Sequence, residues 1–163
     1  MQGRTCCCLT IMEYLSYLED SHLLHFVPKF DYSQRKQLVN PRKVYAIDTG
    51  LVNVNSASFT DDSGRLLENM VYLHLRRQYK DIFYFSGKGE CDFVAFHKGN
   101  MQVAIQVCYH LNADNLDREL NGMVEALDFF NCAEGLLVTH AQRDEFEKAG
   151  KRITVLPAHE YLI

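Results

Sequence analysis

Residues 89–110 constrain the fold of this chain more than any other segment, because they predict a β-hairpin. Their sequence is GECDFVAFHKGNMQVAIQVCYH, in which apolar and polar residues alternate on both sides of a Lys-Gly-Asn turn. A three-residue loop that contains glycine is typical of two antiparallel strands joined by a tight turn. The chain is therefore expected to contain an antiparallel pair of strands near its centre.

Pairing His97 with Met101 sets the expected register of this hairpin. It gives two polar pairs: Asp92 with Gln106, and Glu90 with Cys108. Because successive strand residues point to opposite faces, one face is expected to carry Glu90, Asp92, Val94 and Phe96, and the other Cys91, Phe93 and Ala95. Cys91 and Cys108 are therefore not expected to share a metal ion.

The rest of the chain predicts an α/β fold from its hydrophobic periodicity. Helices are expected over 11–20 after a Thr10–Glu13 capping box, from Asp62 or Ser63 through Leu75, over 116–130, and over 141–149 with an end at Gly150. Strands are expected over 23–27, 43–47, 81–85, 91–97, 101–109, 135–139 and 153–157. This order predicts a mixed sheet flanked by helices.

Composition limits the class of protein. With 163 residues, of which 47% are apolar, the chain can bury a core without disulfides or a structural metal. Its six cysteines form no Cys-x-x-Cys pair, so a reducing cytoplasm is expected rather than a disulfide framework or a zinc knuckle. No apolar run approaches the ~18 residues of a membrane span, so no membrane partner is expected. The role of Cys6, Cys7 and Cys8 stays open.

Five basic residues form the expected contact surface for nucleic acid: Lys29, Arg35, Lys36, Arg42 and Lys43. A net charge of −4 gives no general attraction to nucleic acid, so such a contact needs a local patch. The alternative is an ordinary solvated surface. A helix followed by a β-ribbon with a basic tip is how a winged helix ends. Residues 1–43 are therefore interpreted as a winged-helix remnant, and residues 44–163 as a second domain.

The order of helix, three strands, helix and strand carries a resemblance that becomes specific at the hairpin. A helix glutamate, a strand aspartate and an acid-x-lysine on the next strand form the layout of PD-(D/E)XK nucleases. Glu68, Asp92, Gln106 and Cys108 occupy those four places. The segments KVYAIDTGL, GRLLENMVYLHLRR, FYFSGKGECDFVAF, AIQVCYHL and LDRELNGMVEALDFF resemble the C-terminal domain of a family of bacterial and archaeal AAA-type ATPases. The resemblance covers residues 10–163 and implies a restriction-endonuclease-like fold that follows an ATPase domain and a winged helix.

Two departures limit what the resemblance implies. The chain has no Gly-x-x-x-x-Gly-Lys-Ser/Thr motif, so it is not expected to hydrolyse ATP by that route. It resembles the end of such an ATPase, either as an expressed fragment or from a late start codon. Gln106 is neutral where Mg²⁺ prefers a carboxylate, and the Cys108 thiol cannot replace a lysine ammonium. Lys88, in the turn before the strand, is the candidate for a relocated cation.

The leading hypothesis is a catalytically degenerate, nuclease-like regulatory domain that binds DNA or a partner protein for the ATPase domain. The first alternative is an active nuclease dependent on Mg²⁺ or Mn²⁺, with Glu68, Asp92 and Gln106 as metal ligands and Lys88 assisting. The second is a protein-interaction module without a nucleic-acid role, such as a homo-oligomer. The sequence does not identify the partner, the oligomeric state or the pathway.

Overall fold

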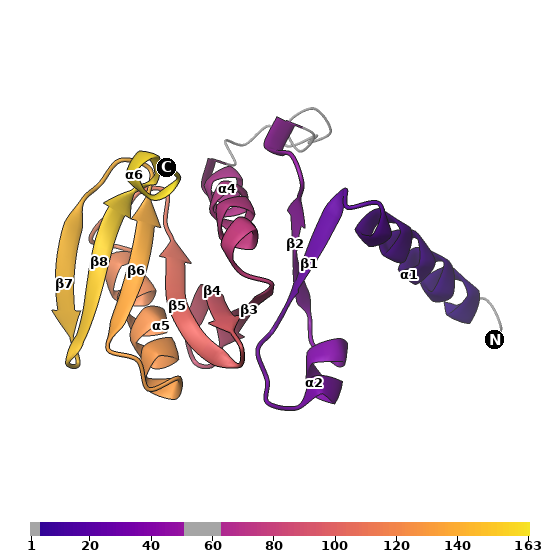
Figure 1. Ribbon diagram of the computed structural model, residues 1–163, viewed down its shortest axis with the longest axis horizontal. Helices are drawn as coiled ribbons and strands as arrows, with labels where there is room; N and C mark the ends of the chain where they lie inside the picture. Colours follow the sequence, from indigo (N-terminus) through magenta and orange to yellow (C-terminus); the bar gives the residue numbers. More distant parts are fainter. Residues whose placement is uncertain (1–3, 51–62) are drawn as a thin grey trace.

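The computed structural model describes residues 4–50 and 63–163, and this part of the chain contains a mixed sheet of six strands (Figure 1). The strands are β3 (Asp81–Ser86), β4 (Glu90–His97), β5 (Asn100–Val107), β6 (Glu134–Thr139), β7 (Asp144–Lys148) and β8 (Lys151–Pro157). Their order in the sheet is β3-β4-β5-β6-β8-β7. The β5–β6 and β6–β8 pairs are parallel, and the other pairs are antiparallel. The predicted α/β fold with a mixed sheet flanked by helices is confirmed.

The remaining elements are α1 (Arg4–Asp20), β1 (Leu24–Pro28), α2 (Gln34–Val39), β2 (Arg42–Ala46), α4 (Ser63–Gln78), α5 (Leu116–Phe129) and α6 (Ala158–Tyr161). β1 and β2 pair antiparallel as a two-stranded ribbon, and α2 lies in the connection where a plain turn was expected. In Figure 1 this ribbon lies beside the sheet and α1 extends away from it. Among the helices that the structure describes, none is long and apolar enough to cross a membrane.

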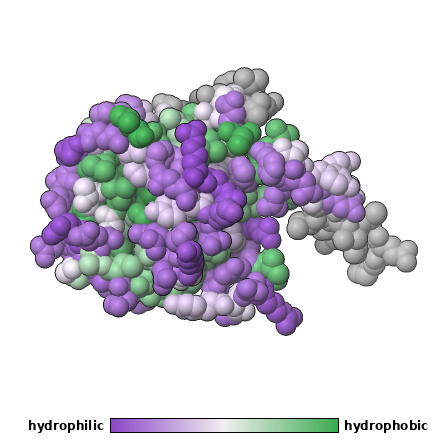
Figure 2. All heavy atoms as spheres, in the orientation of Figure 1, coloured by the Kyte–Doolittle hydropathy of each residue, from purple (hydrophilic) through white to green (hydrophobic). Residues whose placement is uncertain are grey.

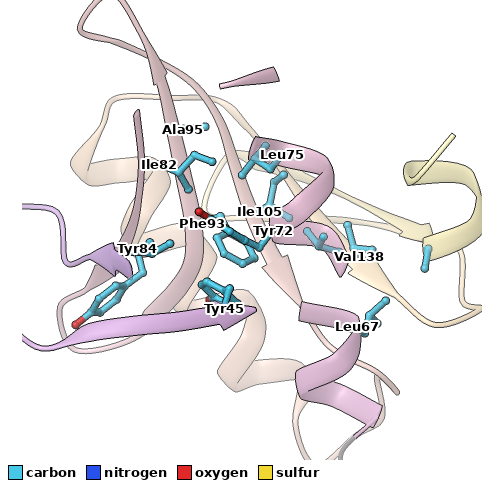
Figure 3. Packing of buried hydrophobic residues seen from close by; sticks show 13 residues of the cluster. Tyr45, Leu67, Tyr72, Leu75, Ile82, Tyr84, Phe93, Ala95, Ile105 and Val138 are labelled. Carbon is cyan, nitrogen blue, oxygen red and sulfur yellow. The ribbon is translucent and has the colours of Figure 1, made fainter. Parts of the chain in front are cut away.

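Each face of the sheet packs against one long helix. On one face, Leu67, Val71, Tyr72 and Leu75 of α4 pack with Phe93, Ala95 and Ile105 of the sheet (Figure 3). On the other face, Leu120, Met123, Ala126 and Leu127 of α5 pack with Val94, Ala104 and Leu137. Burial of apolar side chains contributes roughly 1.5–3 kcal/mol for each large residue, so these two clusters are the main stabilising parts of the fold. In the view of Figure 2 the surface is mostly hydrophilic, with hydrophobic residues in small separate groups.

Core packing and hydrogen bonds join the β1–β2 ribbon to the sheet and to α4. Tyr45 of β2 is 5% exposed and stacks on Tyr72 of α4, with ring centroids 4.5 Å apart (Figure 3). The buried amide of Asn69 accepts from the Ala46 N–H at 2.8 Å and donates to the Ala46 carbonyl at 2.9 Å. The expected boundary between residues 43 and 44 therefore lies inside a strand that is packed on the core.

The two edges of the six-stranded sheet differ. At the β3 edge, Lys29 forms a parallel bridge with Tyr84, and the Phe30 N–H donates to the Tyr84 carbonyl at 2.8 Å. The Tyr84 hydroxyl donates to the carbonyl of Pro41, the residue before β2, at 2.9 Å. At the other edge, β7 has the sequence DEFEK, in which Phe146 is the one uncharged residue.

Residues 144–148 form a strand, so the predicted helix over 141–149 is wrong. Phe146 is half-buried while Glu145 and Glu147 are exposed, which is the period-two alternation of an edge strand. Ala149 and Gly150 have φ angles of 52° and 73°, and Lys148 pairs with Lys151. These two residues therefore form a tight hairpin turn, and Gly150 does not end a helix.

The register of the β4–β5 hairpin is the predicted one toward the core and differs at the tip. Val94 pairs with Ala104, as expected, but His97 pairs with Asn100 rather than with Met101. The turn has two residues, Lys98 and Gly99, with φ angles of 51° and 78°. A register shift between Ala95 and Phe96 absorbs the extra residue, so Phe93, Val94 and Ala95 keep the expected pairing with Ile105, Ala104 and Val103.

Helix α1 begins at Arg4, earlier than predicted, so Thr10 lies inside the helix and the predicted capping box is wrong. The side chains of Cys6, Cys7 and Cys8 lie outside the described residues, as does Asp62, one of the two expected starts of the next helix. That helix, α4, is described from Ser63.

Candidate functional site

A bulge in β4 turns Asp92 toward α4. The pairs Phe83–Val94 and Phe85–Cys91 are two residues apart on β3 but three residues apart on β4. One extra residue therefore lies between Cys91 and Val94, and it shifts the alternation of side chains by one position. Such bulges commonly re-aim a side chain beside a functional site.

The bulge also corrects the expected distribution of residues between the two faces. Cys91 packs with Val94 in the cluster on the α5 side, whereas Phe93 packs in the cluster on the α4 side. The prediction that Cys91 shares a face with Phe93 is therefore wrong. Cys108 belongs to the same apolar cluster as Cys91, so the expected separation of these two cysteines on opposite faces is also wrong.

Three carboxylates surround the ammonium group of Lys43. Lys43 Nζ lies 2.7 Å from Asp92 Oδ1, 2.7 Å from Glu90 Oε1 and 3.2 Å from Glu68 Oε1. We call these four residues the Lys43 cluster. Lys43 comes from β2, Glu68 from α4 and both other carboxylates from β4. The cluster thus connects the ribbon, a helix and the sheet, and it removes Lys43 from the expected nucleic-acid patch.

Hydrogen bonds fix the carboxylates of the cluster. The Tyr45 hydroxyl donates to Glu68 Oε1 at 2.6 Å, and the Val107 N–H donates to Asp92 Oδ2 at 2.8 Å. Asp92 is only 6% exposed, so both of its oxygens need such partners. Glu90 is the most accessible member, with 48% of its side chain exposed. The Lys43 ammonium also lies 5.6 Å from the centre of the Tyr84 ring.

The cluster has three carboxylates for one ammonium, which perturbs its proton affinities. Burial, together with the charge of Glu68, raises the pKa of Asp92 to about 6, although Lys43 opposes this shift. Burial disfavours the charged form of Lys43, but Asp92 and Glu68 outweigh it and hold the Lys43 pKa above its ordinary value. Burial and then the charge of Glu68 raise the pKa of Tyr45. The cluster therefore raises the proton affinity of Asp92 and keeps Lys43 charged.

Gln106 points toward α5 and not toward Glu68. Its Nε2 donates to Glu119 Oε2 at 2.6 Å, and its Oε1 accepts from the Asp92 N–H at 3.0 Å. Arg118 donates to Glu119 Oε1 from Nε at 3.1 Å and from Nη2 at 2.6 Å. The side chain expected to bind a metal thus bridges α5 and the backbone of Asp92. The sequence analysis did not identify Glu119 and Arg118.

Cys108 packs on the α5 side, outside the Lys43 cluster. Its Sγ lies 3.5 Å from Asn115 Nδ2 and 3.4 Å from the His110 carbonyl. Burial and the charge of Glu119 raise the pKa of the Cys108 thiol, which favours the neutral form. Cys108 therefore supplies neither a cation nor a thiolate beside Asp92.

Lys88 lies in the loop between β3 and β4, and Glu125 of α5 binds the backbone of this loop. The Glu125 carboxylate accepts the backbone N–H groups of Lys88 and Gly89 at 2.9 and 2.6 Å. A Cβ on Gly89 would lie 2.7 Å from the Cα of Gly122, so the loop approaches α5 too closely for a larger residue. These contacts place Lys88 at the rim of the cavity that opens onto the cluster.

This cavity has a volume of about 480 Å³. Its lining includes Glu68, Glu90 and Asp92, together with Lys88 and Arg118. Within residues 4–50 and 63–163, no group of three or more His, Cys, Asp and Glu side chains is arranged to hold a metal ion. The donor set does not fit Mg²⁺, because Lys43 already bonds the three carboxylates and the Gln106 carbonyl is used within the protein.

On β2, Tyr45 was not among the expected site residues, and Lys43 was expected only as a contact for nucleic acid. They alternate with Val44, which is 51% exposed, so both point to the same side of β2. This alternation was present in the sequence, but the basic neighbours of Lys43 favoured its assignment to a surface patch.

The other basic residues of the expected nucleic-acid patch lie on or beside the ribbon. Arg35 and Lys36 are exposed on α2, and Lys36 Nζ lies 3.8 Å from Asp31 Oδ2. Arg42 is exposed at the start of β2, and Lys29 is partly exposed beside β3.

Comparison with known proteins divides the chain into two matched segments. A family model described as "Domain of unknown function (DUF4143)" matches residues 63–161, and one described as "Domain of unknown function (DUF8612)" matches residues 9–62. The chain is 38% identical over 122 residues to the uncharacterized protein MJ1544 of Methanocaldococcus jannaschii. That match covers 72% of this chain and 26% of the relative, so the chain spans about a quarter of the relative's length. No solved structure matches.

Proposed function

We propose that this chain, which belongs to the DUF4143 domain family, is a nuclease-like binding domain. In this proposal the domain does not hydrolyse DNA efficiently, and it regulates an AAA-type ATPase. The nuclease-like part of the proposal rests on the sequence resemblance and on the placement of Glu68 and Asp92 together. The ATPase association rests on the same resemblance, since the family description gives no function.

The Lys43 ammonium is the observation that carries the proposal. It makes charge-assisted contacts of 2.7–3.2 Å with the carboxylates that a metal ion would need. Lys43 of β2 supplies the positive charge that would otherwise balance the three carboxylates. Its ammonium also occupies the position that Mg²⁺ would need. Phosphodiester hydrolysis of the PD-(D/E)XK type depends on that metal, so a centre filled by Lys43 holds the fold together without catalysing the reaction.

DNA cleavage tests this proposal. Supercoiled plasmid and linear duplex are incubated with the protein in Mg²⁺ and in Mn²⁺, beside an Asp92→Ala variant prepared in parallel. We expect cutting by the original protein to be no greater than cutting by the variant. Metal-dependent cutting that Asp92→Ala abolishes would refute the proposal.

An active nuclease is the second candidate, and one observation favours it. Lys43 places an ammonium 2.7 Å from Asp92, which is the group that Cys108 does not provide. In that case Lys43→Met would abolish cutting as completely as Asp92→Ala. Under the leading proposal, neither variant has cutting activity to lose.

A further inference from the structure

An aromatic groove lies between the segment that follows β1, the β4–β5 hairpin and the end of α5. It has a volume of about 580 Å³, and its rings are Phe30, Tyr32, Phe83, Phe96, Phe129 and Phe130. Phe30 lies at its centre and stacks on Phe96, with ring centroids 5.2 Å apart and planes 8° apart. Neither the Lys43 cluster nor the cavity beside it uses these residues.

Two of the aromatic residues that line the groove, Tyr32 and Phe129, are exposed to solvent. Tyr32 stacks on Phe129 with centroids 5.7 Å apart and an interplanar angle of 30°. Tyr32 is nevertheless 79% exposed, and Phe129 is 47% exposed. Phe30 contacts both rings in edge-to-face geometry, with centroids 5.3 Å from Tyr32 and 6.1 Å from Phe129, while much of the surface of the pair remains available to a flat ligand.

Three exposed cations lie close in sequence to residues that line the groove. Arg35 and Lys36 follow Tyr32 on α2 and are exposed, and Lys98 is exposed in the hairpin turn whose next residue, Gly99, lines the groove. Asp31 and Asp81 reduce this charge locally, since Asp31 lies 3.8 Å from Lys36 and Asp81 lines the groove. Exposed cations next in sequence to two parts of the groove lining suit a polyanion that carries flat rings.

We propose that this groove binds single-stranded nucleic acid. Unpaired bases stack on Tyr32 and Phe129, and the phosphates contact Arg35, Lys36 and Lys98. A duplex is a poor ligand, because its base faces are already stacked inside the helix. The inference rests on the proposed function, for which it supplies the ligand class of a binding domain that does not cut.

The exposed aliphatic residues of α2 are the argument for a different occupant. Leu38 and Val39 are 69% and 76% exposed, and such residues suit a protein partner. They do not line the groove, and neither do the three cations, so the two exposed rings that do line it decide between the occupants. The nucleic-acid assignment therefore accounts for the groove itself.

Fluorescence anisotropy with a labelled dT20 strand in EDTA tests the inference. We expect the full chain to bind dT20 more tightly than a duplex of equal length, and Tyr32→Ala to weaken binding roughly 5- to 100-fold. Tyr32→Phe should keep most of the affinity. The matched control is Tyr109→Ala, which removes a 40% exposed tyrosine that also stacks on another ring, His140, at 4.7 Å.

Charge reversal gives an independent readout. Lys36→Glu should weaken binding and reduce the dependence of affinity on salt, whereas Arg152→Glu, at a similarly exposed position between Glu134 and Glu145, should change both less. Circular dichroism verifies that each variant is folded.

Three outcomes would overturn the inference: no binding of dT20, equal binding of the duplex, or equal effects of Tyr32→Ala and Tyr109→Ala. If dT20 is not bound and Tyr32→Ala alters only self-association in light scattering, the groove is a protein contact. Cutting of dT20 when Mg²⁺ replaces EDTA would refute the proposed function instead, and the binding data would stand.

Discussion

Lys43 belongs to the ribbon, but its ammonium is held by carboxylates of α4 and β4. The side chains of Lys43 and Asp92 are 21% and 9% exposed, so water compensates little for a lost contact. A single lysine therefore determines the charge balance of the centre and adds to the contacts that attach β2 to α4 and the sheet.

Lys43→Met should lower the free energy of unfolding by roughly 2–3 kcal/mol, because three carboxylates would lose their counter-ion. This is below the value for a fully buried ion pair, since Glu90 is half-exposed. Urea denaturation followed by circular dichroism measures the change. Lys36→Met is the matched control, because its 3.8 Å pair with Asp31 is exposed and should contribute less than about 0.5 kcal/mol. Equal losses in the two variants would contradict the prediction.

The raised pKa of Asp92 predicts a stability change between about pH 4 and pH 6. Asp titrates near ~3.9 in the unfolded chain and near about 6 in the folded protein. Between these values the folded state binds more protons, so the contribution of Asp92 to stability falls as the pH rises and is constant above the folded pKa. The fall is at most about 3 kcal/mol.

Urea denaturation of the original protein and of Asp92→Asn at several pH values between 4 and 8 tests this dependence. The unfolding free energy of the original protein minus that of the variant should decrease as the pH rises through the window, because the variant cannot titrate at this position. A difference that is independent of pH would show that Asp92 titrates normally in the folded protein.

At the scale of elements, the sequence predicted the structure where the hydrophobic periodicity was long. Helix α5 and strands β6 and β8 lie where they were expected, because their apolar residues face a core. β7 was not predicted, since its one apolar residue, Phe146, gives no period within five residues. The bulge at Asp92 was also missed, because a one-residue shift depends on how β3 pairs with β4 and leaves no local pattern.

The site could be predicted only in part for the same reason. Glu68 and Asp92 do lie together, as their pattern indicated. Lys43 and Glu119 reach the site from elements that are distant in the sequence, and their contacts depend on tertiary packing. Gln106 was expected opposite Asp92, but the direction of its side chain is determined by the hydrogen bond to Glu119.

The β7–β8 turn contains a residue that is unfavourable in its conformation. Ala149 has a φ of 52°, which costs an L-residue with a Cβ roughly 1 kcal/mol and which asparagine tolerates better. Ala149→Asn should therefore raise the free energy of unfolding by about 0.5–1 kcal/mol. Thermal and urea unfolding measure the gain, and Ala141→Asn at another exposed position should give none. A loss of stability in Ala149→Asn would contradict the assigned turn.

At the scale of the whole molecule, the ribbon is part of the core although the two family matches meet at residues 62 and 63. Val27 and Tyr45 are 2% and 5% exposed in the cluster on the α4 side. Helix α1 differs, because Tyr14 and Tyr17 are 62% and 64% exposed. The two N-terminal parts therefore contribute very differently to stability.

Two truncated chains test this difference. A chain of residues 63–163 should unfold at a markedly lower temperature than the full chain, because it loses two core side chains worth roughly 1.5–3 kcal/mol each and leaves Asp92 without Lys43. A chain of residues 21–163 lacks only α1 and should unfold close to the full chain. Calorimetry compares the three, and equal melting of 63–163 and 21–163 would show that the ribbon is dispensable.

The protection of the two sheet edges limits how copies of this protein can associate. An uncovered edge strand is a template onto which another chain can add a strand, and this leads to aggregation or swapped assemblies. Here Lys29 and Phe30 occupy the backbone of β3, and the charges of DEFEK make β7 a poor template. Extension of the six-stranded sheet from one molecule to the next is therefore disfavoured at both ends.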